Sequence, residues 1–191
     1  MTGGAFESAV GALTAALRGL AIPHAIIGGV AVISYGIARA TVDVDVTIPG
    51  EGVEIDGLIA ALEKAGFDQR ISDAATFARR SQVLLLRHRA SQVPVDLALA
   101  WLPFEREMLA ATVQRAFAGL SIPVPSVTDL LIMKIVAHRP KDVGDAEQLV
   151  RTHAIDFARA RRVLGEFCVA LEDDERLATL ERLAASPDAD R

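Results

Sequence analysis

The sequence predicts an α+β fold, with a small mixed sheet flanked by helices and followed by a C-terminal helical bundle. Strand-type and helix-type patterns are mixed up to about residue 122, and only helix-type patterns follow the stiff Pro123-Val124-Pro125 segment. The chain has 191 residues, which is enough for one domain with a sizeable core. We therefore expect an α/β core with an N-terminal helix in residues 1–122, and a helical region in residues 123–191.

The first strands and helices follow from hydrophobic spacing. Apolar residues at helical intervals predict an amphipathic helix over Ala5–Leu20, and Pro23 ends it. A short apolar run predicts a buried strand at residues 24–28, followed by a short helix over Val30–Tyr35. Near-perfect alternation of polar and apolar residues predicts a strand over Val42–Ile48.

The same spacing continues through the rest of the first half. Ile55–Ala65 has the inward-facing leucines of a helix, and Gly66 is placed to cap it. Gln82–Arg89 and Val93–Ala100 are predicted to be two strands with a short connection. Phe104–Ala116 is predicted to be helical.

Beyond residue 125, the sequence predicts three or four helices. Their expected ranges are Val127–His138, Lys141–Thr152, Phe157–Leu171 and Glu175–Ala184. This run of helices, with no strand pattern between them, is what distinguishes the second half from the first.

Composition excludes several classes of protein. Cys168 is the single cysteine, which rules out an internal disulfide framework and a multi-cysteine metal site, and indicates a cytoplasmic protein. The net charge of −5 argues against a molecule that binds nucleic acid over its whole surface, although a local basic patch stays open. The uncharged stretch 19–38 is broken by Pro23 and several glycines, so we expect no membrane span, and Glu7 argues against a signal peptide.

Three aspartates carry the strongest chemical signal. Alternate strand residues point to the same face, so Asp43 and Asp45 share a face with Thr41, and their carboxylates lie about 7 Å apart along the strand. Asp96 points away from the apolar face of the later strand. If the two strands are neighbours, three like charges converge, and a hard divalent cation such as Mg²⁺ or Mn²⁺ resolves the repulsion. The alternative is a solvated strand face with exposed aspartates.

Gly28-Gly29 stands between a buried strand and a short helix. Glycines at such a place let backbone N–H groups approach phosphate oxygens, although a simple turn is the alternative. The order Gly28-Gly29, Arg39, Thr41, Asp43-Val44-Asp45 and a later strand aspartate resembles the DNA polymerase β-like nucleotidyltransferase superfamily. Many members have serine at the position of Gly29, so phosphate contact here would depend on backbone N–H groups.

Lys134 and two further aspartates form a second polar group. Lys134 is the one charged residue between Leu130 and Ala137, where a lysine is costly unless it meets an anion or reaches the rim. Asp142 and Asp145 are three residues apart on one face of the next helix. The alternative is that they only stabilise the N-terminus of that helix by their interaction with the helix dipole. The string Ser126-Val-Thr-Asp129-Leu-Leu-x-x-Lys134, followed by Arg139-Pro-Lys141-Asp142-x-x-Asp145, resembles the AbiEii-like branch of the superfamily, which includes toxins of type IV toxin–antitoxin systems. The resemblance covers about residues 25–150.

The resemblance implies a Mg²⁺-dependent (or Mn²⁺-dependent) enzyme that moves a nucleoside monophosphate from an NTP to a hydroxyl of RNA (tRNA) or of a protein. It implies that the helical region completes the active site, and it makes a cognate antitoxin an expected partner. Asp43, Asp45 and Asp96 would hold the metal, and Asp96 would alternatively act as the base. The nucleotide-binding residues it implies are Gly28, Gly29, Arg39, Thr41, Lys134 and Asp142.

Some roles stay open at this point. Lys134 would contact a phosphate, and Asp142 or Asp145 would orient it or help to deprotonate the acceptor. Arg39 would steady the triphosphate or pair with an aspartate. A second hypothesis is a non-catalytic module with the same fold, acting as an antitoxin or regulator. A third, weaker one is nucleic-acid binding through a basic group on and beside one strand: Arg79, Arg80, Arg87, His88 and Arg89.

Overall fold

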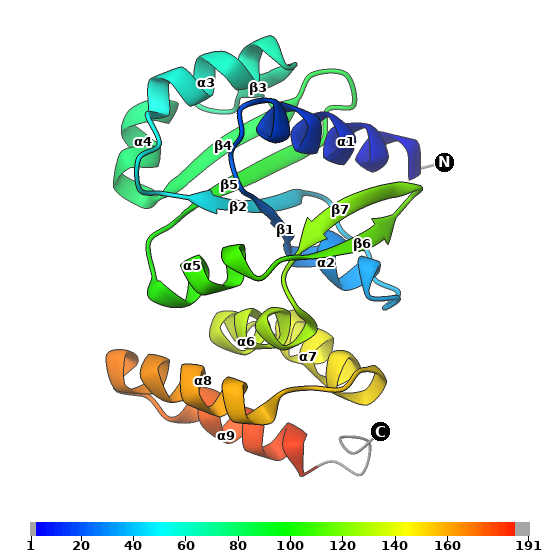
Figure 1. The fold of residues 1–191 in the computed structure, drawn as a ribbon, viewed down its shortest axis with the longest axis vertical. Helices are drawn as coiled ribbons and strands as arrows, with labels where there is room; N and C mark the ends of the chain where they lie inside the picture. Colours follow the sequence, from blue (N-terminus) through cyan, green and yellow to red (C-terminus); the bar gives the residue numbers. More distant parts are fainter. Residues whose placement is uncertain (1–2, 186–191) are drawn as a thin grey trace.

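A five-stranded sheet forms the centre of the first half of the molecule (Figure 1), in a computed structural model that describes residues 3–185. Its strands have the order β1-β2-β5-β4-β3, and β2 and β5 are parallel while every other neighbouring pair is antiparallel. A two-stranded hairpin lies beside it. The strands are β1 (Ala25–Ile27), β2 (Val44–Pro49), β3 (Phe67–Gln69), β4 (Val83–His88), β5 (Pro94–Ala100), β6 (Val113–Phe117) and β7 (Leu120–Val124).

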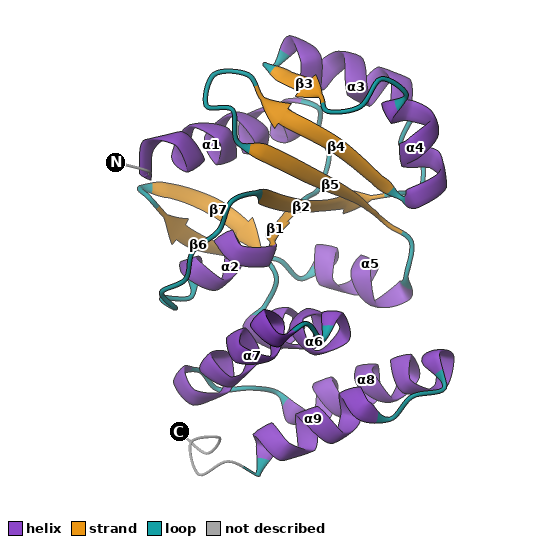
Figure 2. Ribbon diagram, turned by 180° about the vertical axis from the view of Figure 1, so that it is seen from behind, coloured by secondary structure: helices purple, strands orange, loops and turns teal. Residues whose placement is uncertain are grey.

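Helices cover the sheet unevenly. α1 and α3 lie over one face, α2 and α5 lie near β1 and β2 on the other side, and α6 to α9 form a separate layer (Figures 1 and 2). The predicted α+β class is therefore confirmed. The helices are α1 (Gly3–Gly19), α2 (Gly28–Ser34), α3 (Ile55–Lys64), α4 (Ala74–Ser81), α5 (Pro103–Ala110), α6 (Val127–Ala137), α7 (Pro140–Thr152), α8 (Phe157–Leu171) and α9 (Glu175–Ala184).

The strand that carries the aspartates is shorter than predicted. It begins at Val44, and Val42 is 76% exposed instead of facing the core. From Val44 onward the prediction is correct, because Val44, Val46 and Ile48 are fully buried. Alternation alone could not locate the first strand residue, since the bend before β2 leaves Val42 without a neighbouring strand to pack against.

The segment after β5 differs most from expectation. The helix predicted for Phe104–Ala116 ends at Ala110, and residues 113–124 form the β6–β7 hairpin. Ala118 and Gly119 both have positive φ, 48° and 84°, as a two-residue hairpin turn requires. Ala118 is an unusual residue for this turn, so the sequence signal is weak. β7 also runs through the division predicted between residues 122 and 123, and residues 186–191 of the predicted helical region lie outside the described part.

Two residues, His138 and Arg139, connect the C-terminus of α6 to the N-terminus of α7. The Ser126 hydroxyl accepts the Asp129 N–H at 3.1 Å and begins α6. His138, in the left-handed conformation, ends it, and Pro140 begins α7 two residues later. The first turn of α7 therefore lies beside the last turn of α6. Among residues 3–185, no helix has both the length and the apolar character needed to cross a bilayer.

Candidate active site

The predicted acidic residues gather at the centre of the sheet. β2 and β5 are neighbours, and Asp45 and Asp96 are direct partners in their parallel register. Asp43 lies just before β2, where the Thr41 hydroxyl donates to its main-chain oxygen at 3.1 Å and lies 3.3 Å from its carboxylate. Partners in adjacent strands share a face, so the carboxylates of β2 and β5 point to the same side of the sheet.

The two glycines fit closely against this group. Gly28 has a φ of 62°, and a Cβ placed on it would lie 1.9 Å from an oxygen of the Asp45 carboxylate. A Cβ on Gly29 would lie 2.6 Å from the Thr41 hydroxyl oxygen and 3.4 Å from the guanidinium carbon of Arg39. Both positions therefore require glycine for space, and Gly28 requires it for backbone conformation as well. At position 29, the place that a serine side chain would take holds the Thr41 hydroxyl.

Asp45 is the most perturbed carboxyl of the group. Burial raises its pKa to about 6, and repulsion from Asp43 and Asp96 adds to this rise, while Lys134 and Arg139 act in the opposite direction. The charges that act on Asp45 therefore come from Asp43 just before β2, from Asp96 of β5, and from cations of α6 and the α6–α7 connection. Strongly perturbed carboxyls of this kind concentrate at functional sites.

Lys134 is buried between the two aspartates of α7. Its ammonium lies 3.0 Å from Asp142 and 2.9 Å from Asp145, and the three side chains are nearly inaccessible to solvent. Burial by itself would raise the pKa of Asp142, but hydrogen bonds from Arg139 and Lys134 hold it below its ordinary value. Of the interpretations left open by the sequence, anion pairing therefore applies to Lys134, with carboxylates as the anions. A phosphate contact stays a prediction.

Arg39 connects the loop before β2 to the helical region. Its guanidinium lies 2.6 Å from Asp145, so in this structure it pairs with an aspartate, one of the two roles predicted for it. Arg139 binds Asp142 from the other side. Cations and carboxylates thus alternate from Arg39 through Asp145, Lys134 and Asp142 to Arg139, and neighbouring charges compensate one another.

Arg70 and Arg139 are two residues of this group to which the sequence assigned no role. Arg70 forms an ion pair with Asp96. It stands in the connection after β3, a three-residue strand with no predictive pattern, and no local signal points to it. Arg139 directly precedes Pro140 and stands three residues before Asp142, and this place next to the predicted aspartates could have drawn attention to it.

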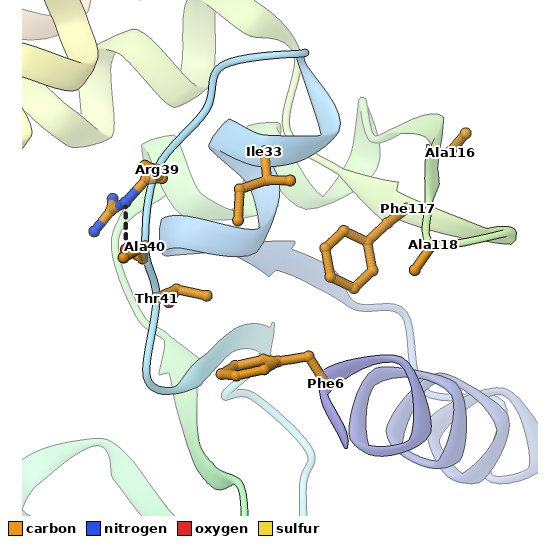
Figure 3. Close-up of a pocket in the computed structure, with 8 residues that line it drawn as sticks. All are labelled: Phe6, Ile33, Arg39, Ala40, Thr41, Ala116, Phe117 and Ala118. Carbon is orange, nitrogen blue, oxygen red and sulfur yellow. Dashed lines mark hydrogen bonds between the residues drawn. The ribbon is translucent and has the colours of Figure 1, made fainter. Parts of the chain in front are cut away.

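A cavity of about 600 Å³ opens beside the acidic group (Figure 3). Thr41 and Ile33 point into it from one side, and Phe6 and Phe117 from the others. Arg39 and Thr41 belong both to the wall of the cavity and to the acidic group, because Arg39 binds Asp145 and Thr41 binds Asp43. The β6–β7 hairpin supplies the far wall, which the sequence did not predict.

The donor set suits a hard cation in kind, but it is not gathered as a finished metal centre. No three His, Cys, Asp or Glu side chains among residues 3–185 are arranged as a metal-binding group. The acids of β2 and β5 offer carboxylate oxygens, which Mg²⁺ and Mn²⁺ prefer. Asp96 forms an ion pair with Arg70. A divalent cation would relieve the repulsion that raises the pKa of Asp45, provided that Asp96 leaves Arg70.

Comparison with known proteins gives the same fold. The antigenic nucleotidyltransferase-like protein from Paracoccidioides brasiliensis is 17% identical, with a TM-score of 0.55 over 91% of both chains. The structure of ANT(2″)-Ia in complex with adenylyl-2″-tobramycin is 18% identical, with a TM-score of 0.53 over 93% of this chain and 96% of that one. No curated protein matches the sequence significantly.

A family model covers almost the whole chain. The model described as the nucleotidyl transferase AbiEii toxin of type IV toxin–antitoxin systems matches residues 12–190. This range includes the glycines, the acidic group and both helices that hold Lys134 and its partners. The chain therefore belongs to the AbiEii nucleotidyl transferase family and is a nucleotidyltransferase enzyme.

Proposed function

We propose that this enzyme transfers a nucleoside monophosphate from an NTP to a hydroxyl of an RNA (tRNA) or a protein, in a Mg²⁺- or Mn²⁺-dependent reaction of the toxin type. One observation carries the proposal: Asp45 and Asp96 are direct partners on parallel strands. Gly28 packs against the Asp45 carboxylate, and Asp43 lies close enough to raise the pKa of Asp45. A cognate antitoxin is a further partner consistent with the family.

The nucleotide would bind at the glycine end of the site. Gly28 and Gly29 present backbone without side chains next to Asp45 and Thr41, so an approaching phosphate meets no Cβ. Arg39 supplies a cation there, and its pairing with Asp145 positions it. The cavity lined by Arg39 and Thr41 gives space on this side.

A divalent cation would be held by Asp43 and Asp45, with Asp96 joining once it is free of Arg70. When bound, it supplies charge neutralisation at the phosphates and polarises the α-phosphate. The Lys134 ammonium is paired with Asp142 and Asp145. We propose that its remaining N–H contacts a phosphate of the nucleotide.

The chain's own carboxylates would handle the proton. The acceptor hydroxyl oxygen forms a bond to the α-phosphorus, the bond between that phosphorus and the oxygen leading to the β-phosphate breaks, and pyrophosphate leaves. In the alternative role of Asp96, in which it does not join the metal, the proton of the hydroxyl passes to its carboxylate oxygen; Asp96 lies on β5, one strand farther from β1 than Asp45.

The test is label transfer. The purified chain is incubated with each α-³²P-labelled NTP, Mg²⁺ and either total RNA or cell protein, beside Asp43→Ala and the control Asp73→Asn. Asp73 is exposed at the start of α4, and its side chain makes no capping hydrogen bond. We expect transfer by the wild type and by Asp73→Asn only. Transfer that is unchanged in Asp43→Ala would falsify the assignment of the site.

Binding separates the enzyme from the non-catalytic alternative. Isothermal titration with Mg²⁺ and each NTP should show binding that Asp43→Ala weakens. An absence of binding at millimolar NTP would favour a module that keeps the fold and acts through a protein partner.

A further inference from the structure

A row of residues leads from the acidic group across the sheet. Asp96 is the partner of Asp45 on one side and of Leu85 of β4 on the other. The main-chain oxygen of Leu85 accepts the N–H of Arg70 at 3.0 Å, so Arg70 continues the row beyond β4. Its guanidinium reaches back over Leu85 to Asp96. The row therefore runs from Asp45, against which Gly28 packs, to Arg70.

The face of the sheet that carries this row is not covered beyond Asp96. α1 and α3 lie behind β3, β4 and β5 in Figure 2, and no described helix lies in front of them. The side chains of β4 agree: Leu84 and Leu86 are fully buried, whereas Leu85 is partly exposed and Arg87 is exposed. We call this surface the open face; it consists of Arg70, Val83, Leu85, Arg87, Pro94, Asp96 and Ala98.

The open face carries Arg70 and Arg87 against the single carboxylate of Asp96, although the chain as a whole carries −5. Arg87 is exposed, lies about 7 Å along β4 from Leu85, and has no ion-pair or hydrogen-bond partner among residues 3–185. Its neighbour across the strands, Asp68, is already bound by Arg89 at 2.6 Å. Aliphatic side chains form the floor between these cations.

We propose that the open face is the acceptor surface of the enzyme and that its occupant is a single-stranded stretch of RNA, whose phosphates bind Arg87 and Arg70. That the bound RNA is the acceptor of the nucleotide rests on the proposed function. A strand on this face arrives at Asp96, which lies one strand beyond Asp45 in the order β1-β2-β5. Guanidinium groups bind phosphate in a bidentate manner.

Charge favours RNA over a protein on this face. A protein that docked here would bind the aliphatic floor and would gain little from an exposed arginine. A phosphate strand gains at every cation, because each contact releases counterions. Arg70 has a second consequence: without RNA it holds Asp96, and a phosphate that draws it away leaves that carboxylate free.

Binding without turnover tests the surface separately from the reaction. A 5′-labelled 12-nucleotide oligouridylate is titrated with the full chain in EDTA without NTP, and fluorescence anisotropy is followed from 50 to 200 mM KCl. For two phosphate contacts, the slope of log K against log salt is expected to be about −1.4. Arg87→Gln should weaken binding about fivefold at 100 mM KCl and change the slope to about −0.7.

Arg79→Gln is the matched control. It removes the same charge, but Arg79 is exposed on α4 and pairs with Asp56 of α3, a helix that covers the opposite face. We expect it to bind like the wild type, and Arg70→Gln to bind like Arg87→Gln. Equal binding by the Arg79 and Arg87 variants, or a slope near zero for the wild type, would overturn the proposal.

The two proposals fail in different ways. Loss of label transfer to every acceptor, with salt-dependent oligouridylate binding still sensitive to Arg87→Gln, would refute the reaction and leave the RNA surface standing. Label transfer to a protein that Arg87→Gln does not reduce would show a protein acceptor and refute the RNA surface alone.

Discussion

Replacing Asp45 with asparagine should make the protein more stable at neutral pH while it removes nucleotidyl transfer. The pKa of Asp45 is raised from 3.8 to about 6 by burial and by repulsion from Asp43 and Asp96. Each pKa unit corresponds to about 1.4 kcal/mol, so the ionised carboxylate destabilises the folded protein on the order of 3 kcal/mol. Asparagine has nearly the same shape and carries no charge.

The gain should depend on pH in one direction. Below about pH 4 the carboxyl is protonated in both the folded and the unfolded chain, so Asp45→Asn changes little. As the pH rises from 4 to 6, the unfolded chain releases its proton first, and the folded wild type loses stability. Above pH 6 the full difference is present.

Urea unfolding followed by circular dichroism, in EDTA at pH 4 and pH 7.5, measures this difference. At pH 7.5 we expect the free energy of unfolding of Asp45→Asn to exceed that of the wild type by about 3 kcal/mol. Asp73→Asn, at an exposed position, should stay within about 0.5 kcal/mol at both pH values. An Asp45→Asn protein that is less stable at pH 7.5, or equally stabilised at both pH values, would refute the reasoning.

Three further changes have clear expected outcomes. Gly28→Ala should abolish label transfer, because its Cβ would lie 1.9 Å from an oxygen of Asp45 and position 28 has a positive φ; circular dichroism should show that the sheet is retained. Lys134→Met should cost about 3 to 5 kcal/mol in urea unfolding, since it leaves Asp142 and Asp145 buried without their ammonium partner. Adding Asp142→Asn and Asp145→Asn to Lys134→Met should recover part of this loss; a triple variant no more stable than the single one would show that the ion pairs are not the cause.

Part of the fold could be predicted because its signals are local. Near-perfect alternation located β2 except for its first residues, and Pro140 marked the start of α7. The β6–β7 hairpin was missed because its turn residues, Ala118 and Gly119, adopt positive φ without the asparagine that usually reveals such a turn. β3 was missed because three residues are too few to show a period.

The sequence by itself determined which side chains carry charge and which face of a strand each one occupies, because alternation and helical spacing are properties of neighbouring residues. It predicted one strand face for Asp43 and Asp45, although β2 begins only at Val44, and it placed the aspartates of α7 three residues apart. Only the tertiary structure decided that Asp45 lies opposite Asp96, because the pairing of strands far apart in the chain depends on the path between them. It also decided that Arg70 holds Asp96, since an ion pair across 26 residues leaves no periodic trace in the sequence.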